Sequence, residues 1–270
     1  MNYLADLRGF LRWSETTKGA ESSPLSLETA DIREYCSFLQ QTRNHTPATV
    51  NRRIQALRKF YDFTTAQGWT RANPAEGVPL VGKTTSVRSK TLTPEEVSRL
   101  LAAVHNSCHR WVVRDWAIMQ VLLGAGLKLG EMIQLRLSDF HPDSDRPHLS
   151  VRGKSGEPGR AVPLEAEVEV ALKRYLVVRR AVPGVDALFV NRNGQPLSTR
   201  SIQRLLSRYA RAAGLNGLTT QALRYVYATK VYQDSGDLKA VARLLGHRHL
   251  ATTVRYLGLE DQAPNGNKKG

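Results

Sequence analysis

The sequence predicts a mainly α-helical protein of two domains, with a small antiparallel β-sheet in the second domain. Three observations support this fold class. Apolar residues recur every three to four positions over most of the 270 residues, which is the period of an amphipathic helix. Two short β-type runs, His148–Arg152 and Arg160–Pro163, flank the turn GKSGEPG and indicate a hairpin. The polar, basic segment Gly82–Lys90 lacks apolar periodicity and separates the two halves.

The first domain, residues 1–82, is predicted to be a small helical bundle. Its first helix carries apolar residues at helical spacing: Leu4, Leu7, Phe10 and Leu11. A second helix opens at Ser26–Thr29 and has the apolar residues Ile32, Tyr35, Cys36, Phe38 and Leu39. Gly68 and Asn73–Pro74 end the helical region.

A third helix of this domain is expected to begin at Thr46–Pro47, because proline is tolerated in the first turn. Its apolar face comprises Val50, Ile54, Leu57, Phe60 and Tyr61. The opposite face is strongly basic and polar, with Asn51, Arg52, Arg53, Gln55, Arg58 and Lys59. The first domain therefore presents one basic helix surface.

The second domain, residues 93–260, is predicted to follow a linker at 83–92. Its first helix begins with Thr93-Pro94-Glu95-Glu96, which combines an N-cap, an early proline and a glutamate in capping-box position. Helices are expected at 93–104, 111–123, 130–135, 165–180, 198–213, 221–233 and 238–245. The polar tail 261–270 (DQAPNGNKKG) is expected to be disordered.

Charge indicates the partner. The chain has 39 Lys and Arg against 24 Asp and Glu, a formal net charge of +15. A chain this basic favours nucleic acid as its partner, although a solvated basic surface without a partner is the alternative. No apolar run is long enough for a membrane helix, and the N-terminus has no signal-peptide core.

The cysteines and histidines suggest neither a disulfide nor a metal site. Cys36 and Cys108 are expected to be buried thiols in a reducing cytoplasm. His247 and His249 are two positions apart and have no Cys or Asp nearby in sequence, so no metal is expected.

Four segments carry a family pattern. They are the closing motif Leu245–Tyr256 (LGHRHLATTVRY), the box Gln221–Thr229 (QALRYVYAT), the hairpin Arg152–Leu164 (RGKSGEPGRAVPL) and the box Gly126–Glu131 (GLKLGE). In this order they resemble the tyrosine recombinases, or phage integrases, and especially the Xer-like branch. Residues 46–75 more weakly resemble that family's core-binding domain. The closing motif is the most specific of these segments.

The resemblance implies phosphoryl transfer on duplex DNA without a metal, a small-molecule cofactor or ATP. Tyr256 would attack a phosphate and form a 3′-phosphotyrosyl link, which splits a hard step in two. Arg224 would clamp the phosphate oxygens through its fork of donors. Lys154, in the hairpin turn, would protonate the leaving 5′ oxygen, and His247 would donate to the phosphate or assist proton transfer.

Two further catalytic positions depart from the family pattern. The family's first Arg is Lys128 here, and the His of its HxLR box is Gln221. Lysine keeps the charge but not the bidentate fork, and this loss is expected to cost ~1–3 kcal/mol of transition-state stabilisation. Glutamine donates a hydrogen bond but cannot titrate. Tyr225 also stands where a histidine is common in the family.

The resemblance also implies which residues contact DNA. In the first domain these are Thr46, Asn51, Arg52, Arg53 and Lys59. In the second they are Arg200, Arg204 and Arg208 on helix 198–213, whose other face is apolar. The two domains would clamp duplex DNA like a C. Self-association as a dimer or tetramer on DNA is expected, although the short tail after Tyr256 leaves the mode of assembly open.

Two other functions stay open from the sequence. The first is a catalytically weak or inactive DNA-binding protein that regulates recombination sites; covalent trapping on nicked DNA would distinguish it. The second is a topoisomerase with related chemistry, which would relax supercoils without a specific site. Taken singly, Tyr256 and Lys154 also have ordinary interpretations, as a surface tyrosine and a solvated hairpin lysine.

Overall fold

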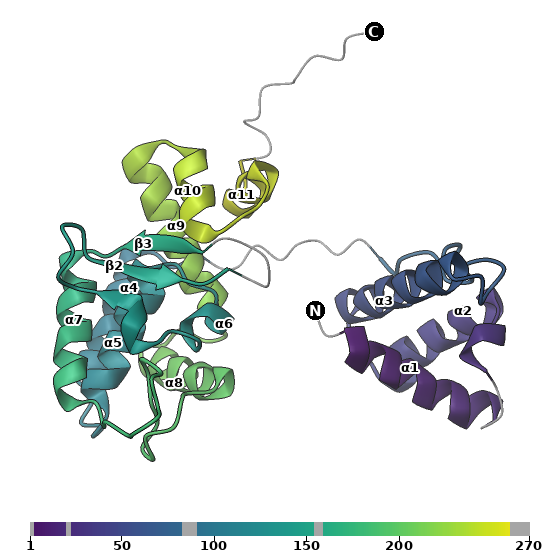
Figure 1. Ribbon diagram of the computed structural model, residues 1–270, viewed down its shortest axis with the longest axis horizontal. Helices are drawn as coiled ribbons and strands as arrows, with labels where there is room; N and C mark the ends of the chain where they lie inside the picture. Colours follow the sequence, from purple (N-terminus) through teal and green to yellow (C-terminus); the bar gives the residue numbers. More distant parts are fainter. Residues whose placement is uncertain (1–2, 20–22, 83–90, 154–158, 260–270) are drawn as a thin grey trace, which may run out of the picture. The chain divides into compact units, whose positions relative to one another are not determined.

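A computed structural model describes residues 3–19, 23–82, 91–153 and 159–259 (Figure 1). The chain divides into two compact units, Met1–Val87 and Arg88–Gly270, and each has its own apolar core. The linker predicted at 83–92 falls mainly outside the described residues, and the tail predicted at 261–270 falls wholly outside them. Both stay predictions.

The first unit is built from helices. They are α1 (Tyr3–Lys18), the short 3₁₀ helix η1 (Pro24–Ser26), α2 (Thr29–Ser37), the π-helical turn η2 (Phe38–Thr42) and α3 (Pro47–Ala66). The Thr46 hydroxyl accepts the backbone N–H of Thr49 and caps α3, as expected for a helix that opens with Thr-Pro.

Aromatic rings fill the core of this unit. Phe10, Trp13 and Tyr35 are buried, and their ring centroids lie 5.0 to 5.9 Å apart. Such pairs stabilise a small core beyond the area they bury. Leu4, one of the apolar residues at helical spacing in the first helix, is 67% exposed. The helix is present, and its buried face is centred on Phe10 and Trp13.

The second unit combines helices with one small sheet. Its helices are α4 (Pro94–His105), α5 (Val112–Gly124), α6 (Leu129–Met132), the 3₁₀ helix η3 (Leu137–Asp139), α7 (Ala166–Val178), α8 (Thr199–Ala212), α9 (Thr220–Ser235), α10 (Leu238–Leu245) and α11 (Leu250–Leu257). Its strands are β1 (Phe140–His141), β2 (His148–Val151) and β3 (Arg160–Pro163), antiparallel in the order β1-β2-β3. The mainly helical fold with a small antiparallel sheet is thus confirmed.

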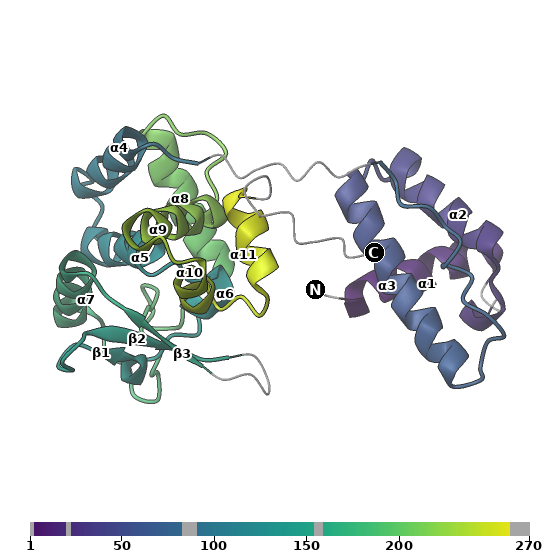
Figure 2. The same ribbon diagram turned by 90° about the horizontal axis from the view of Figure 1, so that it is seen from above.

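The sheet positions the predicted hairpin. β2 and β3 pair from His148–Pro163 to Val151–Arg160, so the turn between them leaves the sheet beside Arg160. α7 packs on α5, and α9, α10 and α11 pack on one another (Figure 2). This last group of helices carries the closing motif.

Three local features differ from the sequence-based expectation. The helix expected at 130–135 is a single turn, Leu129–Met132. Helix α11, which carries Tyr256, was not among the predicted helices. Cys36 is buried but Cys108 is exposed, so the expectation of two buried thiols was wrong for Cys108.

Among the described residues, no helix has the length and hydropathy that a membrane span requires.

Candidate active site

Arg224 lies at the centre of the candidate site. It projects from α9 and is 2% exposed. Its Nη1 donates to the carbonyl of Gly126 at 2.6 Å, and its Nη2 donates to the carbonyl of Leu245 at 2.6 Å. The guanidinium therefore joins the loop after α5 to the end of α10. Gly126 is required in that loop, because it has φ +56° and a Cβ there would lie 2.1 Å from the ring of Tyr227.

His247 contacts Arg224 at the turn between α10 and α11. Gly246 ends α10 with φ +64°, and the chain then places the His247 Nε2 3.3 Å from Arg224 Nη2. Arginine can only donate, so Nε2 must accept and the proton of the neutral ring lies on Nδ1. Nδ1 in turn donates to the Thr253 hydroxyl at 2.9 Å.

Electrostatics keep this imidazole neutral. Burial, followed by the positive charges of Arg224, Lys128 and Arg160, lowers the pKa of His247 to about 4. At neutral pH the ring therefore offers a lone pair next to the buried guanidinium.

Tyr256 lies on α11, and Gln221 holds its hydroxyl. The Gln221 side-chain amide donates to the Tyr256 oxygen at 2.9 Å, and the hydroxyl donates to the Gln221 backbone carbonyl at 3.4 Å. The Tyr256 ring lies 5.5 Å from the rings of both Tyr225 and His247. Burial raises the pKa of Tyr256 to about 12 against the opposing charge of Arg224, so the phenol is protonated before any reaction.

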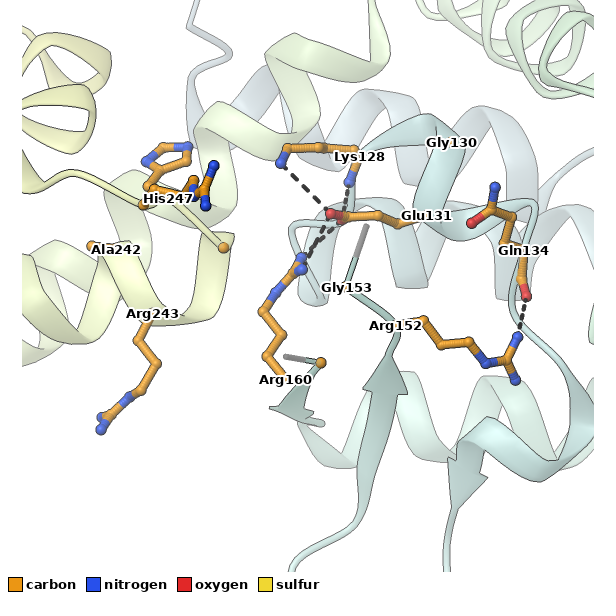
Figure 3. Close-up of a pocket in the computed structure, with 13 residues that line it drawn as sticks. Lys128, Gly130, Glu131, Gln134, Arg152, Gly153, Arg160, Ala242, Arg243 and His247 are labelled. Carbon is orange, nitrogen blue, oxygen red and sulfur yellow. Dashed lines mark hydrogen bonds and ion pairs between the residues drawn. The ribbon is translucent and has the colours of Figure 1, made fainter. Parts of the chain in front are cut away.

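Lys128 is connected to this cluster through Glu131. Lys128 Nζ lies 3.7 Å from Glu131 Oε1, and the Lys128 backbone N–H donates to Glu131 Oε2 at 2.8 Å. The same Oε2 is 3.8 Å from Arg224 Nη1. Figure 3 shows Glu131 between Lys128 and Arg160, at the wall of a cavity of about 830 Å³ that His247 also lines.

The structure thus brings together five of the six predicted catalytic residues. Gln221 contacts Tyr256, His247 contacts Arg224, and Lys128 reaches Arg224 through Glu131. Lys154 lies outside the described residues. Glu131 and Arg160 were not singled out from the sequence, although both belong to segments that carried the family pattern. The described residues hold no group of three or more His, Cys, Asp and Glu side chains arranged for a metal ion.

On α3, the residues predicted to contact DNA have partners within the first unit. Asn51 pairs with both backbone groups of Val81, at 2.8 and 3.0 Å. Arg52 donates to the buried carboxylate of Asp6, and Arg53 Nη1 donates to the Tyr35 hydroxyl at 3.3 Å. Lys59 lies over the Tyr3 ring at 5.4 Å, and Thr46 caps the helix. These contacts order the side chains, and their role towards DNA stays a prediction.

On α8, Arg200 and Arg204 are exposed, whereas Arg208 has a structural partner. Arg208 Nη2 donates at 2.8 Å to Asp115, a fully buried carboxylate on α5. Arg114 and the Tyr209 hydroxyl donate to the same carboxylate. Asp115 was not found from the sequence, because a single Asp in an apolar helix gives no indication of which cations surround it.

Comparison with known proteins identifies the family of the chain. The phage integrase family model matches residues 90–263, and the N-terminal SAM-like domain of phage integrases matches residues 1–71. Tyrosine recombinase XerC of Alcanivorax borkumensis is 35% identical over 243 residues, covering 88% of this chain and 77% of the relative. XerC of Staphylococcus carnosus is 34% identical over 241 residues, covering 88% of this chain and 79% of the relative.

Solved structures show the same fold. XerH bound to a palindromic difH substrate, in a post-cleavage complex, is similar with a TM-score of 0.75 at 22% identity, over 97% of this chain and 75% of that one. A lambda integrase dimer bound to a COC′ core site is similar with a TM-score of 0.72 at 19% identity, over 100% of this chain and 90% of that one.

Proposed function

The chain belongs to the phage integrase family of tyrosine recombinases, and from that premise we propose that it cuts and rejoins duplex DNA at a specific site through Tyr256. The observation that carries this assignment is that Tyr256 and His247 both lie beside the buried guanidinium of Arg224. A nucleophile, a neutral imidazole and a phosphate clamp are the groups that metal-free phosphoryl transfer requires.

The proposed step is an in-line exchange at phosphorus. The Tyr256 oxygen forms a bond to phosphorus while the bond from phosphorus to the 5′ oxygen breaks. The phenol proton passes to His247, and the ammonium of Lys154 supplies a proton to the 5′ oxygen. A bound phosphodiester brings negative charge next to His247, which opposes the cations that lower its pKa and makes the ring a better base.

In the proposal, Gln221 acts on the nucleophile. Its amide donates to the Tyr256 oxygen, so it stabilises negative charge on that oxygen during attack and when the phenolate leaves in the rejoining step. Because an amide does not titrate, this contribution is independent of pH.

Lys128 is proposed to slow strand cleavage relative to an arginine at this position. Its ammonium faces Glu131 and offers a point charge where a guanidinium would offer two parallel donors to a phosphate. The protein remains a recombinase in this proposal, with a reduced rate rather than a lost activity.

We further propose that the protein assembles as a dimer or tetramer on its DNA in the cytoplasm. Support comes from the lambda integrase neighbour, which was solved as a dimer bound to a core site. Sedimentation of the chain with a duplex that carries one or two sites would measure the number of copies bound.

The test of the nucleophile is Tyr256→Phe on a suicide duplex that is nicked near the cleavage site. The variant should bind DNA almost as tightly as wild type, because one hydroxyl is a minor part of a charged interface. It should form no covalent adduct, whereas wild type should. An adduct that persists in Tyr256→Phe would show that another residue attacks.

A further inference from the structure

Arg160 joins two parts of the unit that each hold catalytic groups. It is the first residue of β3, and its side chain is 13% exposed. Nη1 and Nη2 donate to the two oxygens of Glu131 at 3.1 and 2.8 Å, and Nε donates to the carbonyl of Leu244 at 2.7 Å. One planar group therefore ties the strand to α6 on one side and to the end of α10 on the other.

On the α6 side, Arg160 acts through Glu131. That carboxylate accepts the Lys128 backbone N–H at 2.8 Å and lies 3.7 Å from Lys128 Nζ and 3.8 Å from Arg224 Nη1. The bidentate pair with Arg160 fixes the carboxylate in one orientation. It also balances its charge, so that Lys128 and Arg224 keep their positive potential for a phosphate.

On the α10 side, Arg160 acts through the turn that leads to His247. Leu244 is followed by Leu245, whose carbonyl accepts Arg224 Nη2, and then by Gly246 and His247. The guanidinium packs directly on this turn, since a Cβ at Gly246 would lie 2.9 Å from Arg160 Nη1. The position of the His247 ring therefore depends on where Arg160 holds the turn.

We propose that Arg160 is a positioning residue for strand cleavage, whose planar fork holds Glu131 and the α10 turn so that Lys128, Arg224 and His247 converge on one phosphate. This inference rests on the proposed function. Lysine cannot replace the fork, because a single ammonium does not reach two carboxylate oxygens and a carbonyl in one plane. Arg160 need not touch DNA in this role, since its fork is already occupied by the protein.

The first experiment compares Arg160→Lys and Arg160→Met with a matched control, Arg179→Met. Arg179 also ties a loop through its guanidinium, donating to the carbonyls of Ala187, Leu188 and Val185, but it contacts none of the catalytic groups. All proteins are assayed as full chains, below their measured unfolding midpoints, for DNA affinity and for single-turnover cleavage of the nicked duplex.

Both Arg160 variants should bind DNA within about threefold of wild type and cleave it roughly 100-fold more slowly, the loss that a small misplacement of reacting groups produces. Arg179→Met should lose thermal stability but cleave within about threefold of wild type. Folded Arg160→Met that cleaves at the wild-type rate would overturn the proposal. So would an equal loss of rate in Arg179→Met, because the effect would then be general destabilisation.

A double-mutant cycle with Glu131→Gln tests whether Arg160 acts through Glu131. If it does, the double variant should be no slower than the slower single variant; multiplied rate losses would contradict the coupling. A wild type that forms no covalent adduct would refute the proposed function itself. A wild type that forms an adduct no faster than Arg160→Met would refute only the role of Arg160.

The pH dependence of the cleavage rate distinguishes an electrostatic role of Arg160 from a loss of packing, because a loss of packing alone would not shift the pKa of Glu131. Glu131 is faced by Lys128, Arg160, Arg224 and His247. Burial raises its pKa, but the contacts with Arg160 and Lys128 outweigh burial and hold the pKa below its ordinary value. Arg160→Met should raise this pKa and so move the acid limb of the cleavage rate to higher pH, with no such shift in Arg179→Met. An unmoved limb would count against the proposal.

Discussion

Lys128 stands where the sequence resemblance leads us to expect an arginine, and we propose that it is a catalytic position. Its ammonium lies 3.7 Å from Glu131 and its side chain is 46% exposed, so the position is open to a larger group. Lys128→Arg should restore a bidentate donor and raise the single-turnover cleavage rate, by about the value of one charge-assisted hydrogen bond, ~1.5–3 kcal/mol. Lys128→Ala should be slower than wild type.

Cleavage rates of wild type, Lys128→Arg and Lys128→Ala can also contradict the assignment of Lys128. Wild type and Lys128→Ala cleaving equally fast would place Lys128 outside the active site. A decrease in rate in Lys128→Arg would show instead that the pocket is packed around an ammonium and rejects the longer side chain.

His247 gives a prediction that needs no DNA. Its pKa is lowered to about 4, so its resonance in isotope-labelled histidine spectra should titrate near pH 4 rather than 6.5. Between these values the unfolded chain binds more protons than the folded one. The contribution of His247 to stability is therefore complete above pH 6.5 and is lost as the pH falls towards 4.

The measurement uses His247→Asn to identify the resonance by its loss. Addition of a short duplex with the target site should raise the midpoint, because a phosphate opposes the charges of Arg224 and Lys128. A midpoint at or above 6.5 in the free protein would contradict the buried, cation-flanked environment of the ring.

Among the helices, α8 carries one arginine that is predicted to contact DNA, Arg204, and another that has a structural partner, Arg208. Arg204 and Arg208 are four residues apart and both face outwards, but Arg208 pairs with the buried Asp115. Arg204→Gln should make the slope of log affinity against log salt shallower by about one, the value of one phosphate contact, and leave thermal stability unchanged.

Arg208→Gln is the matched control on the same helix. It removes one of the donors to a buried carboxylate, which should destabilise the chain by about 1–3 kcal/mol. Thermal unfolding and salt titration of both variants are the measurements. Equal destabilisation by the two substitutions would contradict the assignment of Arg208 as the structural member of the pair.

Among the secondary-structure elements, the sequence predicted those whose limits are set by apolar periodicity or by capping residues. The hairpin β2–β3, the capped start of α4 and the amphipathic α8 all follow from residue patterns that act locally. The bounds of α6 and the existence of α11 were not predicted. Tertiary contacts that no local pattern shows hold them, Glu131 with Arg160 for α6 and Gln221 with Tyr256 for α11.

The sequence predicted those residues of the site that lie within recognisable motifs. The family resemblance of the motifs indicated Arg224, His247 and Tyr256, and the structure places them in contact. It could not show that Asp6 pairs with Arg52 or that Asp115 pairs with Arg208, because each pair joins helices far apart in sequence. A basic residue in a sequence gives charge, and only the fold shows how much of that charge the protein itself neutralises.

For the whole molecule, the net charge of +15 is the property with the widest consequence. A protein that neutralises many phosphates releases their counterions, so its DNA affinity should fall steeply as salt rises. The two units have separate apolar cores, so the second should stay folded when the first is removed. Both properties can be tested with one pair of proteins.

The full chain and a fragment of residues 83–270 would be titrated with a 40-base-pair duplex at several salt concentrations. If both units contact the backbone, the fragment should lose much of the affinity and have a shallower slope, because the phosphates that α3 neutralises are no longer contacted. Cooperative unfolding of the fragment is the control for folding. An unchanged slope would show that the cations of α3, two of which, Arg52 and Arg53, already pair with Asp6 and Tyr35, are used within the first unit and do not reach DNA.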